Sequence, residues 1–334
     1  MGRAAKPRVG FLGAGWIGRH RMAAMIASGC VEPVAVCEPG ADNLREALAL
    51  APGLRAAESP EALLALGLDG VVIATPSALH AAQSIQALEA RAAVFCQKPL
   101  GRDAGEAAAV VAAARAADRL LGLDLSYRFT EGVRQIGELL ARDALGRLFA
   151  IDLTFHNAYG PDKPWFYDRA QSGGGCVMDL GIHLADLALW LTDFPAAEVT
   201  DAALYAGGAA LGEGSVEDYA VATVRLGDGV TLRLACSWRL HAGQDAVIEA
   251  AFYGAEGGAA LRNVGGSFYD FTAEHFRGTA RETLALPPDD WGGRAAVDWA
   301  ERLAAGARFD ESAERFVRTA ALLDSIYARA RERA

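Results

Sequence analysis

The chain has 334 residues, of which 52% are hydrophobic and 22% charged, and its net charge at pH 7 is −10. This length is roughly twice that of a typical single domain, so we expect two domains. The apolar content excludes a largely disordered chain, and the negative charge argues against nucleic acid as a partner because a phosphate backbone would be repelled.

The first 125 residues alternate short apolar runs with longer stretches rich in Ala and Leu. The runs predict strands at Val9–Leu12, Pro33–Cys37, Val71–Ala74, Ala93–Cys96 and Leu120–Leu125. The stretches between them predict helices at Ile17–Ser28, Ala41–Leu50, Ala78–Ala90 and Asp103–Ala117. Strands this apolar are covered on both faces, so we expect a doubly wound α/β domain with a parallel sheet over residues 1–125.

Residues 126–334 show a different periodicity. Apolar residues alternate with polar ones over Phe149–Phe155 and over Val230–Trp238, which is typical of strands with one buried face. Gly227–Gly229 predicts a tight hairpin and hence antiparallel pairing. We therefore expect a second, α+β domain over 126–334, with helices on one face. An amphipathic helix near its end, which includes Phe316 and Tyr327, would pack on either domain.

A glycine motif follows the first expected strand and opens the first expected helix. In Gly13-Ala14-Gly15-Trp16-Ile17-Gly18, the first glycine suits a tight turn, the second lets a pyrophosphate approach, and the third allows close helix–strand contact. The helix N-terminus would offer N–H groups and a partial positive charge to the phosphates. The order of strand, motif, helix and second strand predicts a dinucleotide site that includes Gly13, Gly15, Trp16, Ile17 and Gly18.

Glu38 ends the second expected strand. A carboxylate at this place accepts hydrogen bonds from the ribose hydroxyls and repels a 2′-phosphate, and the next residue is Pro39 rather than an arginine. We therefore expect NAD as the preferred cofactor, with NADP as the alternative.

The apolar stretch over residues 173–191 carries a narrow ionisable stripe. At about 100° per residue of α-helix, one face carries Asp179, His183, Asp186 and Trp190, and this face must meet a cavity, a partner or a ligand. Asp179 lies four residues before His183, so its carboxylate could orient the imidazole for proton transfer. A purely structural pair, or a metal site that adds Asp186, is the alternative. Gly173–Gly175 indicates a close backbone approach where this helix begins.

Lys98 follows the expected strand Ala93–Cys96, within Gln97-Lys98-Pro99. Ligands of parallel α/β sheets lie beyond the carboxyl ends of the strands, so Lys98 would project toward the nicotinamide. An ammonium there can bind a substrate hydroxyl and stabilise its alkoxide character as hydride leaves. An ordinary surface lysine is the alternative.

Together these motifs resemble those of the glucose–fructose oxidoreductase/inositol dehydrogenase/MocA (Gfo/Idh/MocA) family. The shared features are the glycine motif, Ala74-Thr75-Pro76 with His80, Gln97-Lys98-Pro99, and Gly174-Gly175 leading to Asp179-x-Gly181-x-His183. The resemblance covers essentially the whole chain. It implies a Rossmann domain, a second domain with a large, mainly antiparallel open sheet, and homodimers or homotetramers built on that sheet.

The resemblance also implies roles for single residues. Lys98 corresponds to the catalytic lysine, Asp179 to a substrate-orienting carboxylate and His183 to the acid/base. The Lys98–Pro99 peptide is expected to be cis. Further positions beside the cofactor are Ala74, Thr75, Pro76, His80, Gln97 and Lys98. The family usually carries Glu where this chain has Gln97, and the amide keeps the hydrogen-bonding ability but removes a negative charge beside the lysine.

Further candidates for substrate binding lie after strands or in loops. Arg128 and Tyr127 follow the last strand of the first domain, and His156 and Asn157 end a strand of the second. Aromatic and polar groups suit stacking on a sugar ring and fixing its hydroxyls. We therefore expect Arg128, Asn157 and Trp165 at the substrate, with Tyr167 and Asp168 nearby, and an ordinary loop is the alternative.

These features predict an NAD(P)-dependent oxidoreductase acting on a secondary alcohol or ketone of a sugar, polyol or inositol. His183 would take the hydroxyl proton, Lys98 would stabilise the alkoxide, and Asp179 would orient the substrate. We expect Lys98 and His183 to converge beside the nicotinamide. The alternatives are an NAD-retaining glycosidase, which oxidises its sugar only transiently, and a non-catalytic regulator that binds dinucleotide and sugar.

The remaining expectations concern the environment of the protein. Five scattered cysteines without a CxxC pair argue against a disulfide framework or a zinc site and fit a reducing compartment. The apolar run at Val9–Leu12 is too short for a signal sequence, and no run reaches about 18 apolar residues. We expect a cytoplasmic enzyme with no metal and no membrane partner.

Overall fold

The computed structural model describes residues 5–212 and 214–333, and it divides into two compact units. Unit 1 contains the chain up to Ser126 and the later segment Gly292–Val317. Unit 2 contains Tyr127–Trp291 and the chain from Arg318 onward. Residues 1 and 334, the outer ends of the two expected domains, lie outside the described residues. The segment 292–317, which the sequence pattern assigns to the second domain, packs in unit 1 instead.

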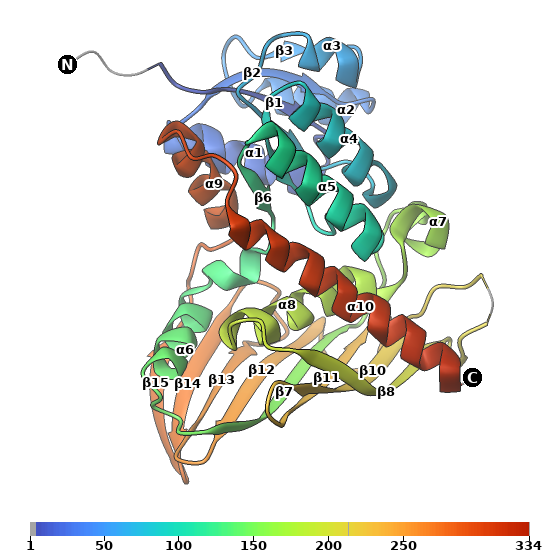
Figure 1. The fold of residues 1–334 in the computed structure, drawn as a ribbon, viewed down its shortest axis with the longest axis vertical. Helices are drawn as coiled ribbons and strands as arrows, with labels where there is room; N and C mark the ends of the chain where they lie inside the picture. Colours follow the sequence, from blue (N-terminus) through green and yellow to red (C-terminus); the bar gives the residue numbers. More distant parts are fainter. Residues whose placement is uncertain (1–4, 213, 334) are drawn as a thin grey trace. The chain divides into compact units, whose positions relative to one another are not determined.

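Unit 1 is built on a parallel sheet with the strand order β3-β2-β1-β4-β5-β6 (Figure 1). Its strands are β1 (Arg8–Leu12), β2 (Glu32–Cys37), β3 (Arg55–Ala56), β4 (Gly70–Ile73), β5 (Ala93–Cys96) and β6 (Leu121–Leu123). The helices between them are α1 (Trp16–Ser28), α2 (Ala41–Leu48), α3 (Pro60–Leu64), α4 (Ser77–Glu89) and α5 (Ala104–Ala117). The predicted parallel α/β sheet is confirmed, and the short β3 and α3 are additions to it. The strand order reverses between β1 and β4, where ligands of such sheets bind.

Helix α9 (Arg294–Ala304) explains why the late segment belongs to unit 1. Its Trp299 is buried against two glycines of the sheet: a Cβ added at Gly70 or at Gly122 would lie 2.7 Å from the indole ring. The ring also contacts Phe95 of β5, with 5.8 Å between the ring centroids. The largest fully buried side chain of this unit is therefore supplied from far along the chain.

Unit 2 contains a nine-stranded sheet in the order β15-β14-β13-β12-β7-β11-β10-β8-β9. Its strands are β7 (Leu148–Asn157), β8 (Ala197–Ala206), β9 (Ala209–Ala210), β10 (Tyr219–Leu226), β11 (Val230–Ser237), β12 (Ala246–Gly254), β13 (Gly258–Asn263), β14 (Phe271–Arg277) and β15 (Ala280–Ala285). All neighbouring pairs are antiparallel except β7 and β11. The large, mainly antiparallel sheet is thus confirmed, as is the hairpin at Gly227–Gly229 that joins β10 to β11.

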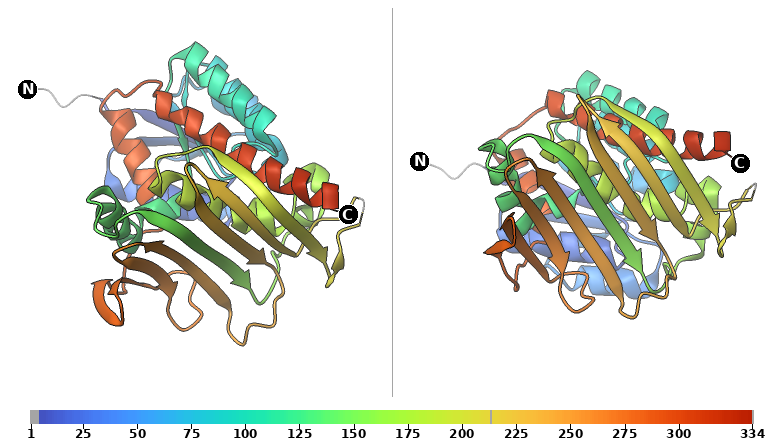
Figure 2. Two further views of the ribbon diagram at one scale, coloured as in Figure 1. Left: turned by 60° about the horizontal axis from the view of Figure 1, so that its bottom comes forward. Right: turned by 90° about the horizontal axis from the view of Figure 1, so that it is seen from below.

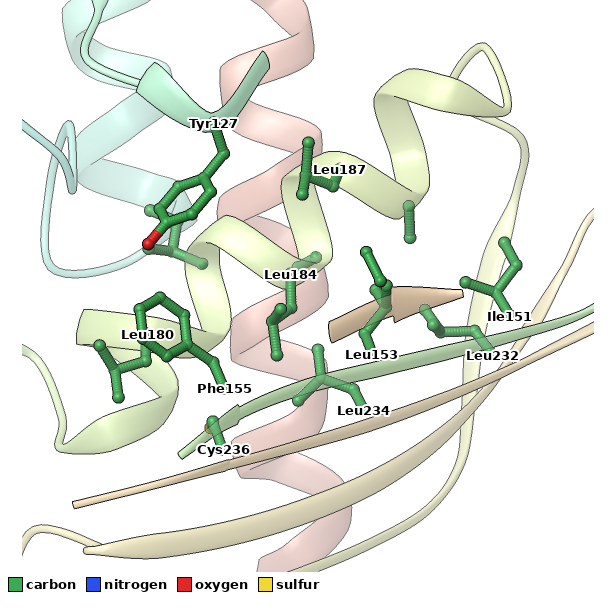
Figure 3. Close-up of a cluster of buried hydrophobic side chains, with 14 of the residues drawn as sticks. Tyr127, Ile151, Leu153, Phe155, Leu180, Leu184, Leu187, Leu232, Leu234 and Cys236 are labelled. Carbon is green, nitrogen blue, oxygen red and sulfur yellow. The ribbon is translucent and has the colours of Figure 1, made fainter. Parts of the chain in front are cut away.

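The helices of unit 2 cover one face of this sheet. They are α6 (Glu131–Ala141), α7 (Arg169–Ser172), a π-helix at Val177–Gly181, α8 (Ile182–Leu191) and the later part of α10 (Glu314–Arg333). Apolar side chains from the sheet meet the π-helix and α8 in the core shown in Figure 3. The labelled members are Tyr127, Ile151, Leu153, Phe155, Leu180, Leu184, Leu187, Leu232, Leu234 and Cys236.

The other face of the sheet is open. The right-hand view of Figure 2 shows the strands with no described helix of this unit across them. Polar residues alternate with the core positions on β7 and β11, and ion pairs such as Arg233–Asp152 cross between the strands. The period-2 pattern therefore predicted the two faces correctly.

One segment of the described chain, Arg169–Leu191, is long and apolar enough to cross a membrane by composition. The expectation of no candidate span needs this correction, because mean hydropathy tolerates the interrupting polar residues that end a continuous apolar run. Its most apolar stretch is 83% buried within the fold, as in the core helix of a water-soluble domain.

The glycine run Gly173–Gly175, just before the π-helix, packs against Glu217 and Tyr327. Oε1 of Glu217 accepts hydrogen bonds from the backbone N–H groups of Gly175 (3.0 Å) and Val177 (2.9 Å) and from the hydroxyl of Tyr327 (2.8 Å). A Cβ at Gly174 would lie 1.9 Å from that hydroxyl oxygen. Burial raises the pKa of Glu217 despite these donors. The close approach predicted at this helix start is thus made to a buried carboxylate.

Replacing Gly175 with alanine is expected to lower the free energy of unfolding by at least about 2 kcal/mol. The added Cβ would lie 1.9 Å from the backbone oxygen of Glu217, so the backbone must shift. Denaturant unfolding measures the effect. Gly212→Ala is the matched control because its Cβ would meet nothing nearer than 3.9 Å. Equal unfolding midpoints for the two variants would contradict the described contact.

Candidate active site

The turn between β1 and α1 has the geometry that a dinucleotide requires. Gly13 has φ +83°, and a Cβ there would lie 2.5 Å from the backbone oxygen of Ala74, at the end of β4. A Cβ at Gly18 would lie 2.7 Å from the backbone oxygen of Gly13. At Gly15, by contrast, a Cβ would meet nothing within 4 Å, and no side chain caps α1. The open position faces space that a pyrophosphate could occupy.

Glu38 lies just beyond β2 and is bonded to two loops. Its Oε2 accepts a hydrogen bond from the N–H of Ala14 (2.7 Å), within the glycine motif, and its Oε1 accepts one from Gly40 (2.8 Å). The carboxylate thus ties the glycine motif to the start of α2. Each oxygen has a further lone pair that a ribose hydroxyl could use.

His80 links the turn after β4 to the segment after β5. Its Nδ1 lies 2.6 Å from the backbone oxygen of Pro99, and its Nε2 lies 2.7 Å from that of Thr75. Burial lowers the pKa of His80, and a neutral imidazole donates to only one of these carbonyls at a time. The hydroxyl of Thr75 donates to Gln83 (2.7 Å), while Pro76 is the N-cap residue that precedes α4. His80 is therefore placed to align two loops at the carboxyl edge of the sheet.

Lys98 follows β5, and its peptide bond to Pro99 is cis, as expected. The backbone N–H of Lys98 donates to Oε1 of Gln97 (3.0 Å). The amide nitrogen of Gln97 donates in turn to Oδ2 of Asp124 (2.7 Å), which also accepts from Nε of Arg21 (2.6 Å). Gln97, expected at the cofactor, is thus bonded to protein groups on both sides.

Asp179 lies in the π-helix of unit 2 rather than in a continuous α-helix. The prediction of one α-helical stripe is wrong here, because the wider π turn changes the angle between successive side chains. Oδ2 of Asp179 accepts a hydrogen bond from Nε1 of Trp238 (3.0 Å). Asp179 is also the one half-buried residue of Val177–Gly181, whose other members are buried. π turns of this kind are frequent at functional sites.

His183 lies in the first turn of α8 and is buried among aromatic rings. Its ring centroid is 4.8 Å from that of Tyr127 and 6.4 Å from that of Phe155. Figure 3 shows the rings of Tyr127 and Phe155 within the same part of the core. Burial raises the pKa of Tyr127, and the charges of Tyr269 and Asp179 add to this effect. Tyr127 is therefore a neutral hydrogen-bonding group beside the imidazole.

Arg128 and Asp186 are paired with each other. The guanidinium donates to Asp186 through Nε (2.7 Å) and Nη2 (2.5 Å), and it lies over the rings of Trp190 and Phe194. Such a bidentate, buried pair is a structural clamp. It gives Arg128 a role in holding α8, and its contact with substrate stays a prediction. The guanidinium also binds both carboxylate oxygens of Asp186, the third ligand of the alternative metal site.

Asn157 and Trp165 differ in what surrounds them. Oδ1 of Asn157 is buried and has no hydrogen-bond partner among the described residues, so a ligand hydroxyl there would relieve an unfavourable desolvation. Trp165 stacks on Phe166, with 3.8 Å between ring centroids. Tyr167 packs on Trp238 at 5.6 Å, which joins this loop to Asp179.

Two other expected substrate residues have structural partners. Asp168 accepts a hydrogen bond from the N–H of Ala170 (2.9 Å) and caps α7. His156 lies on the open face of the sheet, opposite to Asn157, where it contacts the hydroxyl of Ser237 (2.8 Å). Burial lowers the pKa of His156. Each of the two thus has a hydrogen-bond partner within unit 2.

Lys98 and the cofactor residues lie in unit 1, whereas Asp179, His183, Asn157 and Trp165 lie in unit 2. Sequence reasoning missed two buried acidic residues that contact these segments, Asp124 and Glu217. Neither lies in a motif, and their hydrogen-bond partners are distant in the sequence: Arg21 for Asp124, and Gly175 and Val177 for Glu217. Within residues 5–212 and 214–333, no three His, Cys, Asp or Glu side chains could hold a metal ion.

Comparison with known proteins identifies both parts of the chain. Residues 7–125 match the family described as "Oxidoreductase family, NAD-binding Rossmann fold", and residues 133–260 match the "GFO/IDH/MocA C-terminal domain". The D-glucoside 3-dehydrogenase of Escherichia coli (strain K12) is 29% identical over 271 residues, which cover 76% of each chain.

Solved structures share the fold over nearly the full length. GenD2 from gentamicin A biosynthesis, in complex with NAD, has a TM-score of 0.83 at 23% identity, covering 100% of this chain and 97% of that chain. KijD10, a 3-ketoreductase from Actinomadura kijaniata in complex with NADP and TDP-benzene, has a TM-score of 0.84 at 22% identity, covering 97% and 98%. Both domain matches and the motif order agree, and the chain belongs to the Gfo/Idh/MocA family of oxidoreductases, with an NAD-binding Rossmann domain followed by the family's C-terminal domain.

Proposed function

We propose that this protein transfers hydride between NAD(P) and a secondary alcohol or ketone of a sugar, polyol or inositol. The observation that carries the proposal is the complete set of Lys98, Asp179 and His183 in a chain of this oxidoreductase family. The name of the curated relative, a glucoside dehydrogenase, supports a sugar as the substrate class.

Unit 1 supplies the groups that would hold the nicotinamide cofactor. The open position at Gly15 and the uncapped start of α1 fit the pyrophosphate, and Glu38 fits the ribose. When bound, the cofactor accepts or supplies the hydride. Thr75, Pro76 and Gln97 surround the carboxyl ends of β4 and β5, where the nicotinamide half would lie.

The chain's own groups would handle the proton and the orientation of the substrate. His183 takes the proton of the reacting hydroxyl, and the aromatic rings around it exclude water. Lys98 donates a hydrogen bond that favours the developing alkoxide, and Asp179, held by Trp238, orients the sugar. The buried Oδ1 of Asn157 accepts a hydrogen bond from a second hydroxyl, and Trp165 contributes an aromatic surface.

Lys98→Ala and His183→Ala are each expected to lower kcat by at least about 100-fold while NADH still binds. Turnover is measured as NADH formed from a panel of sugars and inositols, and NADH binding by fluorescence titration. Lys163→Ala and His241→Ala, at exposed positions, are the matched controls. A wild-type rate in either test variant would reject its role. Net NADH formation by the wild type would exclude the non-catalytic regulator and the NAD-retaining glycosidase.

We infer that NAD is preferred to NADP because Glu38 would repel a 2′-phosphate. Glu38→Gln removes the charge and leaves one amide oxygen to accept from either Ala14 or Gly40. The ratio of kcat/KM for NADP to that for NAD is therefore expected to rise at least about tenfold. Glu32→Gln, at the opposite end of β2, is the control. If Glu38→Gln leaves the ratio at the wild-type value, the carboxylate does not select the cofactor.

We further infer that copies of the chain associate through the open face of the nine-stranded sheet. An uncovered sheet face with an exposed apolar residue such as Val221 of β10 supports this assembly. Val221→Lys is therefore expected to shift the sedimentation velocity profile toward the monomer. Val264→Lys, also exposed but in the loop after β13, serves as the control. A monomeric wild type, or an unchanged profile for Val221→Lys, would reject this interface.

We infer a cytoplasmic location from the cysteines. All five are free thiols, and Cys176 and Cys236 remain unbonded with their sulfur atoms 3.8 Å apart. Unpaired thiols are typical of a reducing compartment, where disulfides are rare.

A further inference from the structure

Three side chains of unit 1 form a chain of hydrogen bonds that ends on the backbone of Lys98. Arg21 of α1 and Gln97 both donate to Oδ2 of Asp124, at 2.6 and 2.7 Å. Oε1 of Gln97 then accepts the backbone N–H of Lys98 at 3.0 Å. Hydrogen-bond donation thus converges on Asp124, from Arg21 on one side and from the Lys98 N–H through Gln97 on the other.

Asp124 is the residue on which this chain depends. Its side chain is 0% exposed, and its Oδ1 has no hydrogen-bond partner among the described residues. The two donors at Oδ2 therefore stabilise the negative charge of the Asp124 carboxylate. A buried carboxylate with so few donors tolerates neither the loss of its cation nor a second negative charge nearby.

Gln97 has the side chain that this arrangement requires. Its amide donates to Asp124 with the nitrogen and accepts from Lys98 with the oxygen, whereas an ionised glutamate has no N–H to donate. A glutamate at this position would bring a second carboxylate to within about 3 Å of Oδ2, and the guanidinium of Arg21 would have to balance both charges. The neutral amide before Lys98 and the carboxylate at position 124 thus form a matched pair.

The backbone on both sides is already held by the sheet. The N–H of Asp124 donates to the carbonyl of Cys96 (2.9 Å), and that of Gln97 donates to the carbonyl of Ile73 (2.8 Å). Arg21 also contacts Nδ1 of His20 (2.9 Å), which lies two residues after the glycine motif on α1. Side-chain exchanges at positions 97 and 124 therefore change the hydrogen-bond network while the β5 and β6 ladders stay intact.

We propose that Asp124 and Gln97 are positioning residues that fix Lys98 for hydride transfer, and that they work only as a carboxylate–amide pair. This deepens the function proposed above, on which the role of Lys98 rests. In this chain the residue before Lys98 is a neutral amide, and the negative charge that a glutamate would carry there is on Asp124, the hydrogen-bond partner of Gln97. Exchanging the two groups keeps one carboxylate and one amide beside Arg21, whereas changing either one alone leaves two carboxylates or two amides there. The double variant should therefore retain much more of the function than either single variant.

The test compares the wild type with Gln97→Glu, Asp124→Asn and the double variant, which has the same net charge as the wild type. Each single variant is expected to lower kcat, per NADH-binding site, at least about tenfold, and the double variant is expected to return to within about threefold of the wild type. Asp118→Asn, which removes an exposed carboxylate paired with Arg308, is the control and should not rescue Gln97→Glu.

A second readout follows Lys98 without any turnover. The chain has three lysines, Lys6, Lys98 and Lys163, so acetylation by acetic anhydride can be followed at each one by peptide mass spectrometry. The labelling rate of Lys98 is expected to change at least about threefold in each single variant and to recover in the double variant, while that of Lys163 stays constant. The free energy of unfolding is measured in parallel.

The outcomes separate the possible failures. A Gln97→Glu variant as active as the wild type, or a double variant whose losses are the product of the single ones, overturns the pairing. Rescue of unfolding free energy alone, with unchanged kcat and Lys98 labelling in all variants, overturns the positioning role. If the wild type turns over no sugar, the proposed function fails, and recovery of Lys98 labelling in the double variant still supports the pairing.

Discussion

A carboxylate that has lost its water must find hydrogen-bond donors inside the protein, and this constraint organises both units. Asp124 takes its donors from Arg21 and Gln97, and Glu217 takes its own from the glycine run and Tyr327. Each of the two acids lies directly behind a segment that carries proposed catalytic groups. The cost of leaving a buried charge without donors is what holds these segments in one conformation.

Features whose physical cause lies within a few residues could be predicted from the sequence. The turn at Gly13 needs a positive φ, and Gly18 needs space beside the preceding backbone, so local sterics alone mark the motif. The alternation along β7 and β11 likewise reports which side chains are buried. Lys98, Asp179 and His183 could be named because they occur in ordered motifs that a known family shares.

Features that depend on distant pairs or on helix geometry could not be predicted in this way. The pairing of Arg128 with Asp186, 58 positions later, leaves no mark in the sequence pattern. The π turn at Val177–Gly181 leaves no signature in the apolar pattern, so an α-helical phase misplaces Asp179 relative to its neighbours. Asp124 and Glu217 carry no motif, and their importance follows only from the donors that the fold brings to them.

The position of Trp299 bears on how the protein is made. Its indole fills the space over Gly70 and Gly122, yet it is translated after the whole of Tyr127–Trp291. A ribosome adds roughly 5–20 residues per second, so the nucleotide-binding half emerges many seconds before its own core can be completed. Until Trp299 has been synthesised, the space over these two glycines stays unfilled, so the final packing of the nucleotide-binding unit waits for a helix encoded after the second sheet.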